Sequence, residues 1–127
     1  MTLRHRGGFT LVEILIVVVI LGLLATIVIP KFTTSRDKAL VTAMKSDLRN
    51  LLTQQESHMA DSGRYAASFP ITVFRPSTGV TGPTIAVTSD GWTATVGHTS
   101  TTRTCAIFAG TSSLAPATKE GVPECTP

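Results

Sequence analysis

The chain has 127 residues, enough for one domain and a short appendage. Hydrophobic residues make up 43% of it and charged residues only 15%, and the apolar residues are concentrated between Phe9 and Ile29. The net charge of +3 does not indicate nucleic-acid binding: of eleven basic side chains, Arg4 and Arg6 precede the apolar segment, which leaves nine against eight acidic ones. No basic run longer than two residues remains, so no specific nucleic-acid partner is expected.

The apolar segment Phe9–Ile29 has 21 residues, of which Glu13 is the only charged one. A helix with a rise of about 1.5 Å per residue would make it about 31 Å long, enough to cross the hydrocarbon core of a membrane. Arg4 and Arg6 stand just before it, and basic flanks of membrane helices stay in the cytoplasm. We therefore expect a single-pass helix with a cytoplasmic N-terminus and the chain after Pro30 outside the inner membrane.

Two simpler interpretations of this segment leave features unexplained. A secretory signal has an apolar region of about 7–15 residues and a small-x-small cleavage site, whereas this run is longer and ends in IVIPKF. A plain membrane anchor leaves Glu13 as a cost of about 2.5–3.5 kcal/mol on insertion scales. A carboxylate in hydrocarbon needs a cationic partner or a proton. Cleavage after Gly8 would create a partner, the α-amino group of Phe9, which meets Glu13 of a neighbouring chain if the helices are staggered.

The sequence RGG followed by FTLVEILIVVVILGLLATIVIPKF resembles the N-terminus of type IV pilin precursors. The resemblance rests on the short basic leader (residues 1–8), Gly8 before the processing point, Phe9 as the first mature residue and Glu13 four positions later. Gly22 and Pro30 also fall where this family commonly has helix-loosening residues. Type II secretion pseudopilins share the same N-terminal segment.

The resemblance implies a processing and assembly pathway. A membrane-embedded prepilin peptidase cuts between Gly8 and Phe9 and N-methylates Phe9, and the pilus assembly machinery then extracts many copies from the inner membrane into a helical filament. In that filament Glu13 pairs with the Phe9 amine of an adjacent copy. The expected protein is a structural subunit of an extracellular type IV pilus that serves adhesion, surface motility or DNA uptake. The alternatives are a type II secretion pseudopilin and, less favoured, a monomeric membrane-anchored periplasmic binding domain.

Gly22 and Pro30 bracket the stretch where the helix is expected to lose hydrogen bonds in the filament. Pro30 has no N–H to donate to the carbonyl of Thr26, and Gly22 has a weak helix preference. Membrane helices tolerate both residues routinely. The expectation of a loosened stretch from Gly22 to Pro30, within the transmembrane and polymerisation helix of residues 9–30, therefore rests more on the resemblance than on physics.

Residues 31–62 predict an amphipathic second half of the same helix. Apolar residues recur there at spacings of three and four, which marks one face: Val41, Met44, Leu48, Leu51, Leu52 and Met59. The charged side chains fall mostly elsewhere: Arg36, Asp37, Lys45, Asp47 and Arg49. With a stop signal at Asp61–Gly63, we expect one helix from about Phe9 to about Asp61.

Residues 63–127 are rich in Thr, Ser, Gly and Pro and predict a β-rich head. Four stretches read as short strands because they contain β-branched residues: Ile71–Phe74, Pro83–Thr88, Trp92–Thr99 and Thr104–Gly110. Ser89–Gly91 predicts a hairpin turn, and Thr99–Arg103 predicts a polar loop.

The apolar strand residues supply the cover that the amphipathic half of the helix needs. We expect Trp92, Val96, Ile107 and Ile85 to pack on Val41, Met44 and Leu48. The predicted fold is α+β: a long N-terminal helix packed on a small antiparallel sheet of three or four strands, an arrangement that resembles pilins.

Cys105 and Cys125 are the only cysteines. They have neither C-x-x-C spacing nor suitably placed histidines, so zinc is not expected. In an exported chain they predict one disulfide, which would close a loop of about 20 residues and add about 3 kcal/mol in the chain-entropy model. The alternative is two buried free thiols. A disulfide would pin the proline-rich tail to the last strand, and this resembles the disulfide-bounded C-terminal loop of many pilins.

We expect no enzyme activity, no cofactor and no metal site. His58 suits a solvated helix face, and the sequence has no G-x-S-x-G elbow, phosphate loop or dinucleotide fingerprint. Major pseudopilins of type II secretion often hold calcium in a C-terminal loop. Here Asp90, Glu120 and Glu124 are the only acidic residues beyond Asp61, and they are sparse and scattered, which disfavours such a site.

Overall fold

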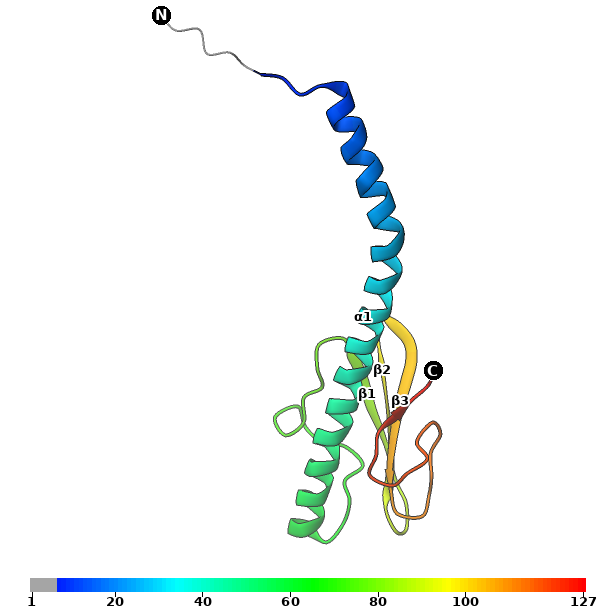
Figure 1. Cartoon of the computed structure of the whole chain (residues 1–127). Helices are drawn as coiled ribbons and strands as arrows, with labels where there is room; N and C mark the ends of the chain where they lie inside the picture. The colour runs from blue at the N-terminus through cyan, green and yellow to red at the C-terminus, as the bar shows by residue number, and fades with distance from the viewer. Residues whose placement is uncertain (1–6) are drawn as a thin grey trace, which may run out of the picture. The chain divides into compact units, whose positions relative to one another are not determined.

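The computed structural model describes residues 7–127 (Figure 1). The leader expected at residues 1–8 lies outside this range apart from Gly7 and Gly8. In chain order the elements are α1 (Leu11–Ser62), β1 (Val80–Val87), β2 (Trp92–His98), β3 (Thr101–Ala109) and β4 (Glu124–Cys125). The chain divides into two compact units, of which the first ends at Arg36 and the second comprises Asp37–Pro127. Helix α1 contributes residues to both.

The described part of the first unit is mainly the N-terminal part of α1. Every large apolar side chain from Leu11 to Ile29 is exposed, each by 43% or more. The helix runs without interruption through Gly22 and Pro30. The loosened stretch expected between them concerns the assembled filament and stays a prediction.

The second unit packs the remainder of α1 against a four-stranded antiparallel sheet in the order β1-β2-β3-β4. The predicted α+β fold is confirmed (Figure 1). Its core is apolar and contains the side chains that the sequence patterns indicated: Met44, Leu48, Leu51, Trp92, Val96 and Ile107 are buried, and Val41 and Ile85 pack against them. Met59, expected on the same helix face, is 37% exposed.

The prediction of a strand at Ile71–Phe74 is wrong. These residues form a turn, in which the N–H groups of Val73 and Phe74 donate to the carbonyl of Pro70. Phe74 is buried in the core, whereas Ile71 is 70% exposed. A β-branched composition does not make a strand where no neighbouring strand pairs with it.

The other strands were placed with small errors at their ends. The turn predicted at Ser89–Gly91 is present, with the Thr88 N–H donating to the Gly91 carbonyl. The polar loop predicted at Thr99–Arg103 is mostly strand, because β3 begins at Thr101, which pairs with His98. The short strand β4 was not predicted.

Two polar side chains of α1 are buried and hold the loop between α1 and β1. Asp47, which the sequence analysis placed with side chains mostly outside the apolar face, is only 3% exposed. Its carboxylate accepts hydrogen bonds from the N–H and the hydroxyl of Ser77, both at 2.8 Å. Gln55 donates to the carbonyl of Ala66 at 2.7 Å and accepts from its N–H at 2.9 Å. The loop is thus attached to the helix at two points.

Replacing Asp47 by Ala is expected to lower the free energy of unfolding by about 1–3 kcal/mol, because the two donors of Ser77 lose a charged acceptor. Chemical denaturation of the full chain in detergent measures this loss. The matched control is Glu56→Ala, since Glu56 is exposed on the same helix. Equal stabilities of the two variants would contradict the role assigned to Asp47.

Candidate functional site

The first turn of α1 is built around Thr10 and Glu13. Oε2 of Glu13 accepts hydrogen bonds from the Thr10 N–H at 2.7 Å and the Thr10 hydroxyl at 2.9 Å. The Glu13 N–H in turn donates to the Thr10 hydroxyl oxygen at 3.2 Å. This reciprocal arrangement is a capping box, which satisfies donors that the start of a helix leaves unpaired.

The capping box fixes where the charge of Glu13 lies. A carboxylate in the first turn of a helix is stabilised by the partial positive charge of the helix N-terminus. Both bonds from Thr10 reach Oε2, which leaves Oε1 outside the capping box, and the Glu13 side chain is exposed. Phe9, the expected first mature residue, stands next to Thr10 and is 84% exposed. The arrangement can present one carboxylate oxygen to an amine from another molecule.

Thr10 was not predicted as a partner of Glu13. A local signal was available, because Thr10-Leu-Val-Glu13 is a Thr-x-x-Glu pattern directly before an apolar run. The predicted partners of Glu13 were cations, whereas its hydrogen bonds come from the same turn of the helix.

Helix α1 is the one helix within residues 7–127 that is long and apolar enough to cross a membrane, and no part of its most apolar stretch is buried. Its apolar side chains therefore require another apolar surface, either lipid or other helices. Gly8, Phe9 and Glu13 lie at the start of this surface, and Gly22 and Pro30 lie along it.

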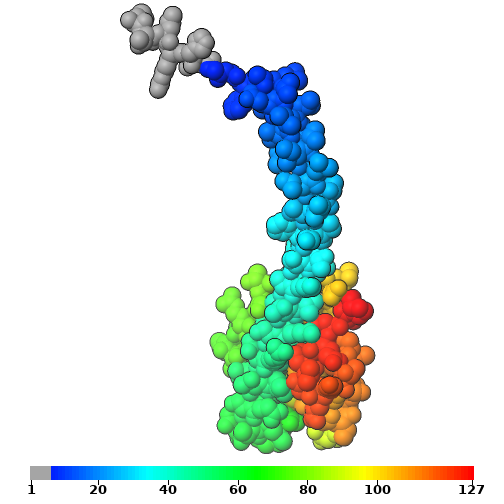
Figure 2. All heavy atoms as spheres, viewed as in Figure 1, coloured from blue at the N-terminus to red at the C-terminus, as the bar shows by residue number. Residues whose placement is uncertain are grey.

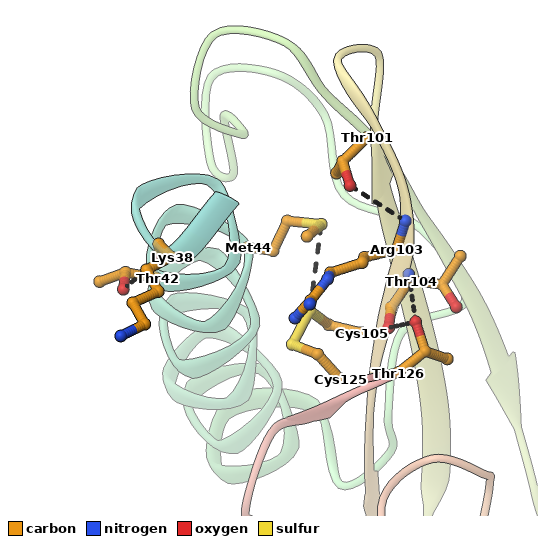
Figure 3. The surroundings of a disulfide bond; sticks show 9 residues. All are labelled: Lys38, Thr42, Met44, Thr101, Arg103, Thr104, Cys105, Cys125 and Thr126. Carbon is orange, nitrogen blue, oxygen red and sulfur yellow. Dashed lines mark hydrogen bonds between the residues drawn. A yellow bond between two sulfur atoms is a disulfide. The ribbon is translucent and has the colours of Figure 1, made fainter. Parts of the chain in front are cut away.

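The predicted disulfide between Cys105 and Cys125 is confirmed. The two residues are direct partners in the antiparallel pair formed by β3 and β4. The sulfur of Met44 on α1 lies 3.9 Å from Sγ of Cys105, and Figure 3 shows Met44 facing the disulfide from the helix. The bond attaches the C-terminal tail to the sheet beneath α1.

His58 is half-buried near the end of α1 and contacts the following loop. Its Nδ1 lies 2.8 Å from the carbonyl of Arg64 and 3.0 Å from the hydroxyl of Ser62. Its ring and that of Phe69 form a T-shaped pair with a centroid distance of 5.9 Å. These contacts tie the C-terminal end of α1 to the following loop.

The three acidic residues of the head beyond Asp61 each accept a hydrogen bond from a backbone N–H. The donor and acceptor pairs are Gly110 N to Glu120 Oε1 at 2.7 Å, Thr111 N to Asp90 Oδ2 at 2.9 Å, and Thr118 N to Glu124 Oε2 at 2.7 Å. The hydroxyls of Thr111 and Thr118 donate to the same oxygens as their N–H groups.

The carboxylates do not fit a calcium site. Calcium takes six to eight converging oxygens, whereas these oxygens face N–H and O–H donors. In the part of the chain that the structure describes, no three His, Cys, Asp or Glu side chains gather as ligands.

The hydrogen bonds donated by Thr111 and Thr118 lower the pKa of the two carboxyl groups that accept them. The hydroxyl of Thr111, followed by its N–H, holds the pKa of Asp90 below its ordinary value. The hydroxyl and N–H of Thr118 do the same for the pKa of Glu124, with smaller contributions from Lys119 and Lys45.

A depressed pKa in the folded state means that the head loses stability as the pH falls. The contribution of Asp90 and Glu124 is complete above the pKa values of the unfolded chain, about 4, and is lost as the pH falls through the lower folded values. We expect the melting temperature of the protein in detergent to fall between about pH 5 and pH 3. The fall should be shallower in the double variant Asp90→Ala/Glu124→Ala, and an unchanged slope would contradict the assignment.

Comparisons with known proteins give one family match and several relatives. Residues 3–29 match the family pattern described as the prokaryotic N-terminal methylation motif. Type II secretion system core protein G of Pseudomonas aeruginosa is 38% identical over 65 residues, which cover 51% of this chain and 46% of that protein. The type IV major pilin protein PilA of Myxococcus xanthus is 41% identical over 63 residues, which cover 50% of this chain and 28% of the pilin.

A third relative, the type IV wide pilus major component PilA4 of Thermus thermophilus, is 33% identical over 66 residues, or 52% of this chain and 50% of that protein. The chain thus spans half the length or less of these curated relatives. Their names divide between pili and type II secretion.

Proposed function

Because the chain belongs to the superfamily of type IV pilins and type II secretion pseudopilins, we propose that it is a structural subunit of a type IV pilus. The peptidase of this pathway cleaves between Gly8 and Phe9 and methylates the new amine of Phe9. The mature subunit waits in the inner membrane as a single-pass protein with its N-terminus in the cytoplasm. The assembly machinery then adds it to an extracellular filament of identical copies.

One observation carries this proposal: the N-terminal part of α1 is apolar on all sides, has its large apolar side chains exposed, and carries one carboxylate in its first turn. An apolar helix alone suits a simple anchor. A carboxylate in an apolar environment is unfavourable unless its charge is paired. The charge of Glu13 is compensated when the Phe9 amine of a second copy reaches its Oε1. The same apolar surface then serves twice, first against lipid and later against neighbouring helices.

Electron microscopy of material sheared from cells, with mass spectrometry of the N-terminus, tests the proposal. We expect filaments of this protein whose subunits begin at Phe9 and carry one added methyl group. A protein that retains residues 1–8 and stays monomeric in the membrane would overturn it and favour the anchored binding domain.

A type II secretion pseudopilin is the second candidate, since a core protein G relative is 38% identical to this chain over 65 residues. The two candidates differ in what deletion of the gene removes. A pilus subunit is needed for surface filaments and for adhesion, surface motility or DNA uptake. A pseudopilin is needed for the export of folded proteins, and a secretion defect with normal surface filaments would favour it.

A further inference from the structure

The C-terminal loop, residues 110–123, connects β3 to β4 and covers the face of the sheet opposite α1. Side chains alternate between the two faces of a strand, so Ala106 and Phe108 point away from the helix that Ile107 contacts. Both are buried, because Ala117 of the loop packs on them. Figure 2 shows these C-terminal residues, in orange and red, gathered on the head. The loop must stay closed for this second small core to exist.

Hydrogen bonds to three carboxylates hold the loop, two at its first residues and one near its middle. Glu120 reaches back to Gly110, where the chain leaves β3. Asp90, in the turn between β1 and β2, accepts a hydrogen bond from the N–H of Thr111, the residue after Gly110. Glu124, the first residue of β4, holds Thr118 in the middle of the loop. Glu120 and Glu124 each hold another residue of the loop, and Asp90 joins the start of the loop to the turn between β1 and β2.

We propose that these three carboxylates close the C-terminal loop without a metal ion, so that the head folds independently of calcium. A backbone N–H presents the positive end of its dipole to the carboxylate, which is the position that a cation would take. A calcium ion at these oxygens would displace donors and leave them unpaired, which is unfavourable. Within residues 7–127, no three His, Cys, Asp or Glu side chains gather to supply the six to eight oxygens that calcium takes. The disulfide between Cys105 and Cys125 holds the end of the loop covalently. The inference concerns the head alone and applies to a pilus subunit and a pseudopilin alike.

Thermal unfolding of the mature full-length protein in detergent tests the first part of the proposal. Near-ultraviolet circular dichroism reports on the head, because Trp92 is the single tryptophan and is fully buried. We expect the same melting temperature in excess calcium chloride and in excess EGTA. A saturable rise of several degrees with calcium would overturn the proposal, since a ligand of the folded state raises the melting temperature.

The variant Glu124→Ala tests the second part, that the carboxylates close the loop. We expect its melting temperature to fall by several degrees, equally with calcium and with EGTA. Glu56→Ala, which removes an exposed carboxylate from α1, should melt like the wild type. A lower melting temperature in the calcium buffer alone would identify Glu124 as a metal ligand. An unchanged melting temperature in both buffers would show that Glu124 does not hold the loop closed. Either result would overturn the proposal.

If Glu124→Ala does not fold, Glu124→Gln provides the test, because its amide oxygen keeps one acceptor for Thr118. Hydrogen exchange of the Thr118 amide should then be at least several-fold faster than in the wild type, with and without calcium. Exchange as slow as in the wild type would contradict closure by the carboxylate charge.

Discussion

Cells that produce only the Glu13→Ala variant should contain the mature subunit in the inner membrane but carry no filaments. The Phe9 amine of each added copy would then lie among apolar helices without its carboxylate partner. Leaving one member of a buried charge pair alone costs about 3–5 kcal/mol, which is a factor of at least about one hundred in the equilibrium for adding each subunit. Counting filaments by electron microscopy, with immunoblots of the membrane fraction, measures the effect.

Two further variants separate charge from shape at this position. Glu13→Gln keeps the size and one acceptor oxygen but loses the charge, and it should also fail to assemble. Glu56→Ala removes an exposed carboxylate from the part of α1 in the second unit and should assemble, because it leaves the charge pair and the apolar segment intact. Normal filaments from Glu13→Gln would show that assembly does not depend on an ionised carboxylate.

The largest expected effect on stability follows from truncating Leu48. Its side chain is fully buried between α1 and the sheet, in the cluster that contains Trp92 and Ile107. Leu→Ala substitutions in well-packed cores lose both transfer free energy and the contacts around the cavity, about 2–5 kcal/mol in total. Stabilities of native domains are only about 5–15 kcal/mol. We expect a lower denaturation midpoint and weaker accumulation of the protein in cells.

Leu24→Ala is the matched control, because it makes the same change on the same helix. Leu24 is 53% exposed in the N-terminal part of α1 and has no contact in the head core. Denaturation of the head, followed through Trp92 in detergent, should be unchanged by it. Similar losses in the two variants would mean that Leu48 contributes no more than an exposed leucine.

The sequence by itself determined the features that depend on neighbours along the chain. The apolar segment, its single carboxylate and the motif around Gly8 and Phe9 are contiguous, and hydrophobic periodicity then indicates an amphipathic helix after Pro30. The capping box of Thr10 and Glu13 is equally local and was readable from its spacing. The turn at Ser89–Gly91 also followed from short-range chemistry.

Only the tertiary structure decided which polar groups are buried and what they bind. Asp47 lies three residues after Met44 and four before Leu51, so its position on the buried face was visible, but its partner Ser77 is 30 residues away. The carboxylates of Asp90 and Glu120 likewise reach segments 21 and 10 residues distant. A buried polar group is stable only where the packed chain supplies a partner, and composition and periodicity along the chain do not specify which distant segment that is.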